Sequence, residues 1–240
     1  PCYPPLPFAL CRPLVLARRV SQRLQRAARR VRQQPVSMRP RLHGLGLHPP
    51  HVHKQDYIKV LAESIGEKLK DIDYEHLLFS YHGVPERHIR KSDITSGACK
   101  MDGKCCFKKG SKQHEFCYRH QCEITTVNVA KYLKLERGTY STTFQSRLGF
   151  DPWLQPYTDR TIERMGKEGL KKMAVVTPAF VSDCLETLEE IAMEGEEIFH
   201  EVGGKVFNTI PCLNDRDSFA QLLASWIENW QTAETNATAI

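Results

Sequence analysis

Several features that would place this sequence in a common class are missing from it. No apolar run approaches the ~20 residues that a bilayer-spanning helix needs, and the nearest, PLVLARRV, is interrupted by Arg18 and Arg19. The opening residues lack the apolar core and cleavage pattern of a secretory signal. No GxGxxG or phosphate-binding glycine loop follows any expected strand. The sequence therefore favours neither a membrane span, nor a secretory signal, nor a nucleotide site.

Negative charge is absent from the first part of the chain. Residues 1–53 contain ten Arg but no Lys, Asp or Glu, so the net charge of +6 leaves −4 for residues 54–240. We expect a basic Arg/Pro-rich arm at 1–53, a mildly acidic domain at 54–232 and a tail at 233–240. Four interpretations of the arm stay open: a solvated or disordered tail, a membrane-surface or nucleic-acid contact, an organellar transit segment, and a non-native stretch.

Cysteine is plentiful and unevenly placed, with nine residues in the chain and five of them in one insertion, residues 91–122. The five are Cys99, Cys105, Cys106, Cys117 and Cys122. Such a cluster is more typical of metal binding than of an extracellular disulfide framework, which predicts a reducing, cytoplasmic compartment. Thiolate ligation of an iron–sulfur cluster or of zinc fits these residues, with His114 and His120 nearby. Because the spacing matches no zinc finger, a loop of free thiols is the alternative.

Helix and strand patterns alternate from Gln55 onward, which predicts an α/β fold with a doubly wound parallel sheet. The expected strands are 76–82, 139–146, 171–178 and 205–211. The expected helices are 57–69, 121–133, 159–168, the acidic segment from 183 and 215–230. Sites in such sheets lie beyond the carboxyl ends of the strands. We therefore expect His82, Arg147 and the helix start at Asp183–Glu186 to share one edge.

The segment FVSDCLETLEEIAMEGEEIFHE carries acids at spacings of three and four, which would place them on one side of an α-helix. They are Asp183, Glu186, Glu190, Glu194 and Glu197. An apolar side is expected from Leu185, Leu188, Ile191, Ala192, Ile198 and Phe199. Like charges one turn apart repel by roughly 0.2–0.5 kcal/mol per pair. A capping box would explain Asp183 and Glu186 but not Glu190 or Glu194, for which a solvated face is the structural alternative.

His82 carries two interpretations. A neutral imidazole is a good base and metal ligand near neutral pH. A loop histidine hydrogen-bonded to the backbone is the alternative.

Three segments, LLFSYHGVPERHIRKSD, TTFQSRLGFDPWLQPYTD and PAFVSDCLETLEEI, resemble the C-terminal half of ferrochelatase, over about residues 53–230. The resemblance implies a chelatase-like (Rossmann-like) domain and a lyase that inserts Fe2+ into protoporphyrin IX to form protohaem in haem biosynthesis. It implies His82 and Glu186 as catalytic residues, and His82, Glu186, Glu190 and Glu194 as metal-binding residues. The substrate-binding residues that it implies are Tyr118, Gln145, Arg147, Trp153, Phe180 and Asp183.

The resemblance also implies porphyrin and ferrous iron as partners and, in some relatives, a [2Fe–2S] cluster on four cysteines. Peripheral membrane association is a further expectation, and no nucleic-acid partner is expected. Two departures qualify it: the family's N-terminal domain is essentially missing, and Cys184 stands where many relatives carry His. A non-catalytic metal- or tetrapyrrole-binding domain and a coproporphyrin-type ferrochelatase are therefore the alternatives.

Overall fold

A computed structural model describes residues 55–238 except 96 and 98, with side chains placed up to residue 230. The basic arm predicted for residues 1–53 lies outside the described residues. The four interpretations of its role therefore stay predictions. Within the described part of the chain, no helix combines the length and the apolar character that crossing a membrane would require.

Four parallel strands form one sheet in the order β2–β1–β3–β4. Their bounds are β1 His76–His82, β2 Tyr140–Gln145, β3 Lys172–Val176 and β4 Val206–Ile210. The register pairs His82 with Gln145 across β1 and β2, and Phe79 with Val176 across β1 and β3. The chain moves outward in opposite directions from β1 and β3, so a topological switch point lies between these strands. This architecture confirms the predicted doubly wound α/β fold.

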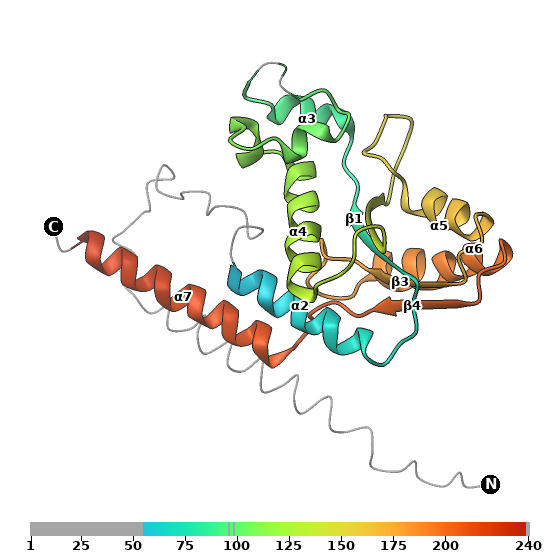
Figure 1. Ribbon diagram of the computed structural model, residues 1–240. Coiled ribbons are helices and arrows are strands. Elements are labelled where there is room, and N and C mark those ends of the chain that lie inside the picture. The colour runs from blue at the N-terminus through green and yellow to red at the C-terminus, as the bar shows by residue number, and fades with distance from the viewer. Residues whose placement is uncertain (1–54, 96, 98, 239–240) are drawn as a thin grey trace, which may run out of the picture. The chain divides into compact units, whose positions relative to one another are not determined.

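Helices cover both faces of the sheet, as Figure 1 shows. On one side are α2 (Gln55–Leu69), α4 (Tyr118–Leu133) and α7 (Asp217–Thr238). On the other side are α5 (Thr158–Lys167), the π-helix η6 (Glu186–Glu194) and α6 (Gly195–Glu201). Each strand feeds a helix that returns over the sheet, which is the connection that parallel pairing requires.

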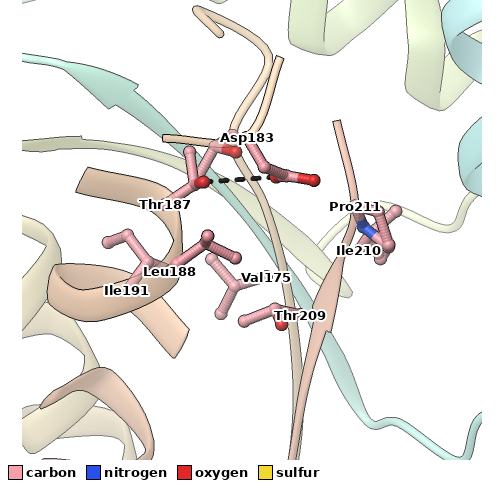
Figure 2. A pocket seen from close by; sticks show the side chains of 9 residues that line it. Val175, Asp183, Thr187, Leu188, Ile191, Thr209, Ile210 and Pro211 are labelled. Atoms are coloured by element: carbon pink, nitrogen blue, oxygen red, sulfur yellow. Dashed lines mark hydrogen bonds between the residues drawn. The ribbon is translucent and has the colours of Figure 1, made fainter. Parts of the chain in front are cut away.

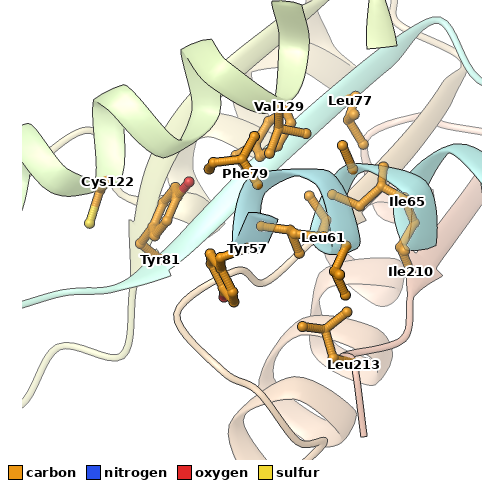
Figure 3. Close-up of a cluster of buried hydrophobic side chains, with 14 of the residues drawn as sticks. Tyr57, Leu61, Ile65, Leu77, Phe79, Tyr81, Cys122, Val129, Ile210 and Leu213 are labelled. Atoms are coloured by element: carbon orange, nitrogen blue, oxygen red, sulfur yellow. The ribbon is translucent and has the colours of Figure 1, made fainter. Parts of the chain in front are cut away.

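Successive strand residues divide between two cores because side chains alternate across a sheet. Leu77, Phe79 and Tyr81 of β1 pack with α2 and α4, in the cluster that Figure 3 shows. Leu78 faces the opposite way and joins Ile191 of the π-helix and Phe199 of α6. Both cores contain fully buried residues of β1, so this central strand is held rigidly up to its last residues.

The chain between β1 and α4, which includes the cysteine-rich insertion, contains short helices that the sequence pattern did not predict. They are α3 (Glu86–Ser92), η4 (Lys104–Phe107) and η5 (Lys112–Glu115). They are too short for the 3.6-residue period to repeat, so hydrophobic periodicity cannot reveal them.

The acidic helix also differs from expectation. Residues 186–194 form a π-helix, whose hydrogen bonds run from residue i to i+5, so the face assignment based on an α-helix was wrong in part. Ile191 is buried as expected, but Leu185 and Leu188 are 70% and 56% exposed. No capping box forms at Asp183 and Glu186: the residue that precedes the π-helix is Leu185, without a side-chain cap.

Replacing Ile191 tests how the π-helix is held. Ile191 is 2% exposed, so Ile191→Ala is expected to lower the free energy of unfolding by about 2–4 kcal/mol through lost burial and a residual cavity. Met193, two residues further and 67% exposed, supplies the matched control: Met193→Ala should change the free energy by less than about 0.5 kcal/mol. Urea titration of both variants measures the difference, and equal effects would contradict this packing.

Candidate functional site

His82 is the last residue of β1 and stands at the edge where all four strands end. Its Nδ1 lies 2.6 Å from the carbonyl oxygen of Gly83. Since a carbonyl oxygen only accepts hydrogen bonds, we assign the proton of the neutral ring to Nδ1 and the lone pair to Nε2. The backbone contact held as the structural alternative is thus present, and it orients the ring as a base at Nε2.

The turn after His82 requires glycine. The Gly83 amide donates to the Gln145 carbonyl at 2.7 Å. A Cβ on Gly83 would lie 2.9 Å from that oxygen and 3.2 Å from the ring of Trp153. The absence of a side chain therefore lets β1, β2 and the Trp153 loop approach one another.

Two predicted site residues flank the imidazole. The Trp153 ring lies 6.4 Å from the His82 ring and the Phe180 ring lies 6.0 Å from it, measured between centroids. Trp153 comes from the loop after β2, where Trp153 forms a backbone bridge with Pro85, and Phe180 comes from the loop after β3. Three chain segments thus bring an imidazole and two aromatic rings together at the switch point.

Glu186 begins the π-helix close enough to His82 for their charges to interact. Hydrogen bonds from its own amide and from the Cys184 thiol, and then the charge of His82, lower the pKa of Glu186 below its usual value. The carboxylate is therefore ionised at neutral pH. Glu194, at the other end of the π-helix, is exposed.

Glu190 has partners that the sequence did not reveal. Its Oε1 accepts a 2.7 Å hydrogen bond from the Ser146 amide, and its Oε2 contacts the Ser146 hydroxyl. We call these two contacts the Ser146–Glu190 clasp. Ser146 has a φ angle of +59°, so the clasp involves a serine in the left-handed region of backbone conformation. A second tie runs from Nε2 of the buried Gln145 to the carbonyl of Glu186 at 3.2 Å. Together they fasten the π-helix to the end of β2.

Asp183 lies at the loop before the π-helix and is also engaged within the protein. Its carboxylate accepts hydrogen bonds from the side-chain amide of Asn214 at 2.7 Å, from the backbone amide of Cys212 at 3.2 Å and from the Thr187 hydroxyl at 3.2 Å. Burial raises its pKa, but the hydrogen bonds from Asn214 and Cys212 outweigh burial and place the pKa below its usual value. Asp183 therefore joins the loop after β4 to the π-helix.

A cavity of about 70 Å³ lies beneath this junction, between the π-helix and strands β3 and β4 (Figure 2). Asp183, Thr187 and Leu188 line it from the helix side. Pockets for drug-sized ligands measure roughly 300–1,000 Å³. The cavity is thus too small for a tetrapyrrole, and it does not include His82 among its lining residues.

The other predicted substrate-binding residues are held by neighbours. Arg147 forms a two-bond ion pair with Asp159, at 2.9 and 2.8 Å, and its guanidinium lies 4.5 Å from the centre of the Tyr157 ring. Tyr118 donates its hydroxyl to the carbonyl of His82 at 2.8 Å. In Gln145, Oε1 accepts from the Ser80 hydroxyl at 2.7 Å. These residues border the site, and their polar groups organise it.

Four of the five insertion cysteines gather in two pairs. The sulfurs of Cys99 and Cys105 lie 3.8 Å apart. A hydrogen bond from Cys106 lowers the pKa of Cys117 to about 6 against the effect of burial. Cys122 faces the core beside Tyr81 instead, and burial raises its pKa (Figure 3). Within residues 55–238, apart from the two undescribed positions, no three His, Cys, Asp or Glu side chains form a ready metal-binding group.

The sequence did not predict the residues that hydrogen-bond the acidic site residues, namely Ser146 with Glu190 and Asn214 with Asp183. Ser146 and Asn214 both have positive φ angles, +59° and +49°. Asn214 is a residue type enriched in that region and follows a strand, which is a weak signal. A serine in that region carries no such signal, and its clasp with Glu190 spans 44 residues of sequence.

Comparison with known proteins gives one family. A family model described as Ferrochelatase matches residues 22–231, starting within the basic arm. The ferrochelatase of Pseudomonas entomophila is 42% identical over 180 residues, 75% of this chain and 53% of that protein. That of Opitutus terrae is 42% identical over 184 residues, covering 77% and 53%. That of Pseudomonas fluorescens (strain Pf0-1) is 39% identical over 205 residues, covering 85% and 58%. The chain spans about half the length of these relatives.

The network around Asp183 has a testable pH dependence. The Asp183→Asn substitution removes the ionised acceptor, and loss of its hydrogen bonds should cost about 1–2 kcal/mol of unfolding free energy at pH 7. The folded pKa lies below the unfolded value, so this stabilisation is complete above pH 3.8 and fades as pH falls through the folded pKa. Denaturant titrations from pH 7 to pH 3 should therefore show the two proteins converging. The exposed Glu189 provides the control: if Glu189→Gln converged equally, the assignment to Asp183 would be wrong.

Proposed function

The chain belongs to the ferrochelatase family, and on this ground we propose that it takes part in inserting Fe2+ into protoporphyrin IX, a lyase reaction that forms protohaem. The observation that carries the proposal is the placement of His82 with Glu186 and two aromatic rings at the switch point of the sheet. Iron is here a substrate.

Metalation must remove two protons from pyrrole nitrogens while a divalent cation enters, so it needs a base next to the macrocycle. The Nε2 atom of His82 is the basic nitrogen of the assigned tautomer, and hydrogen bonding of Nδ1 to Gly83 holds the ring in one orientation. We assign His82 the role of acceptor for both protons in succession, each of which leaves for solvent along the acids of the π-helix before the next is accepted. Glu186, ionised beside it, stabilises the imidazolium that forms.

The macrocycle is proposed to lie over the open edge, against Trp153 and Phe180. Aromatic rings offer large apolar faces for a flat tetrapyrrole. The carboxylate of Glu190 accepts a hydrogen bond from the Ser146 amide. A cation that binds Glu190 would therefore share this carboxylate with Ser146. Glu194 is exposed and can meet hydrated Fe2+ at the outer end of the π-helix. The proposed metal and proton path therefore runs from Glu194 past Glu190 to Glu186 and His82.

Replacing His82 or Glu186 tests this assignment directly. His82→Ala and Glu186→Gln are each expected to lower metalation of protoporphyrin by at least ~100-fold, because general acid–base groups contribute about 10²–10⁴ in rate. The chain is incubated anaerobically with protoporphyrin and Fe2+ or Zn2+, and turnover is followed by the change in porphyrin fluorescence. Circular dichroism should show the same fold in both variants.

Matched controls come from the same elements. His88 on α3 and Glu189 on the π-helix are exposed, and His88→Ala and Glu189→Gln should metalate normally. Near-normal metalation by His82→Ala would overturn the proposal. Stoichiometric porphyrin binding without turnover would identify a binding domain instead, and faster turnover of coproporphyrin would change the substrate.

We also propose that the insertion holds a [2Fe–2S] cluster on Cys99, Cys105, Cys106 and Cys117. For metal–sulfur bonds of about 2.3 Å in a tetrahedral site, two ligand sulfurs lie about 3.8 Å apart, which matches the 3.8 Å between Cys99 and Cys105. The hydrogen bond between Cys106 and Cys117 supplies the second pair. Bound there, the cluster would supply one-electron chemistry and would crosslink the insertion.

Visible absorption tests the cluster. Protein purified anaerobically is expected to show a visible band that is lost in Cys105→Ser, since one thiolate ligand is removed. Cys122→Ser should keep the band because Cys122 packs in the core. Colourless wild-type protein that contains zinc would show that the thiols bind zinc.

Peripheral membrane association and a cytoplasmic location stay predictions. The exposed side chains of Leu148 and Phe150 at the sheet edge support the first, and the disulfide-free state of the seven described cysteines is compatible with the second.

A further inference from the structure

The cysteine insertion and His82 meet at one structural element, the first turn of α4. This helix begins at Tyr118, directly after Cys117. Residues 117–120 contact the rest of the insertion on one side and the sheet edge on the other, so a single turn joins the two regions. These contacts are a feature of tertiary structure, since they join segments 14 to 36 residues apart.

The contact with the site is made by Tyr118. Its hydroxyl donates to the backbone carbonyl of His82 at 2.8 Å, at the last residue of β1. The Tyr118 side chain is half-buried. Its hydroxyl therefore fixes the backbone from which the imidazole projects.

Several contacts organise the same turn and join it to the rest of the insertion. The Cys117 sulfur caps the helix by accepting from the His120 amide at 3.5 Å. The His120 Nδ1 lies 2.6 Å from the carbonyl of Cys106, whose thiol hydrogen-bonds Cys117. The His120 ring stacks on His114 at 3.6 Å, and His114 Nε2 lies 2.7 Å from the carbonyl of Cys105. The segments around Cys106 and around His114 thus both contact the first turn of α4.

Arg119 makes a parallel link. Its guanidinium donates to the carbonyl of Met101 in the insertion and to the carbonyl of Gln155, both at 3.2 Å. Gln155 follows Trp153 in the loop that flanks His82. The first turn of α4 therefore touches both the His82 backbone and the aromatic loop beside it.

We infer that Tyr118 is a positioning residue for His82, and that it transmits the chemical state of the Cys117 thiol to the site. Any change at Cys117, whether ligation or alkylation, alters the cap of α4 and shifts the residue that follows it. A loss of the cap loosens Tyr118, and the end of β1 loses one of its anchors. The insertion then controls the proton acceptor without touching substrate.

A double-mutant cycle tests the inference on the whole chain. The variants are Cys117→Ala, Tyr118→Phe and the double variant, and the readout is the rate at which diethyl pyrocarbonate acylates His82, measured by peptide mass spectrometry. Each single variant should raise the rate about five-fold, the effect of losing one hydrogen bond. The double variant should match the singles, because both act through one contact.

The matched control is Tyr132→Phe, a tyrosine near the other end of α4 that donates to Glu63 at 3.0 Å; it should leave the His82 rate unchanged. Additive effects, or an unchanged rate in Tyr118→Phe, would overturn the inference. If Cys117→Ala fails to fold, Cys106→Ala takes its place, since it removes the thiol that bonds Cys117.

Metalation by the same variants separates this inference from the proposed function, on which its catalytic meaning rests. Tyr118→Phe should lower kcat about five-fold with KM unchanged, because substrate contacts remain. If the effects of the two substitutions on the acylation rate are non-additive but the chain never metalates porphyrin, the positioning role is supported and the proposed enzymatic function is rejected. If the chain metalates porphyrin normally but the two effects on the acylation rate are additive, the proposed function is supported and the positioning role is rejected.

Discussion

The parallel pairing of β1 with both β2 and β3 is the constraint on which the site depends. Parallel strands that share one register end at the same edge, so every loop that leaves a strand begins there. Because the order reverses between β1 and β3, their following loops diverge and leave His82 between Trp153 and Phe180. The burial of β1 on both faces makes the imidazole a fixed point around which the other groups are arranged.

The acids of the π-helix and of the loop before it differ in their surroundings. Asp183 and Glu190 accept several internal hydrogen bonds each, and they tie the helix to the ends of β4 and β2. Glu186 lies within electrostatic range of His82, and Glu194 is exposed. The electrostatic repulsion between neighbouring carboxylates is therefore offset at Asp183 and Glu190, where the carboxylates accept hydrogen bonds. The same hydrogen bonds hold the π-helix against the ends of the strands, while the carboxylates of Glu186 and Glu194 make no such ties to the described strand ends.

Much of the fold follows from the sequence because its signals are local and repeated. Buried strands appear as short apolar runs, and helices of ten residues or more repeat their period often enough to be recognised. The placement of His82 and Glu186 at one edge follows from the strand-end rule. The insertion is different: its helices are short, and the grouping of its thiols depends on contacts with α4, which no local pattern contains.

By itself the sequence determined the order of strands and helices, the family, and the residue types that gather at the carboxyl edge, because periodicity and long motifs survive without coordinates. Only the tertiary structure decided which of those residues face outward. The clasp between Ser146 and Glu190, the Asp183 network and the Tyr118 contact with His82 join residues far apart in the chain. Hydrogen-bond partners across such distances are selected by packing, and a carboxylate or hydroxyl looks the same in sequence whether it binds substrate or supports the wall behind it.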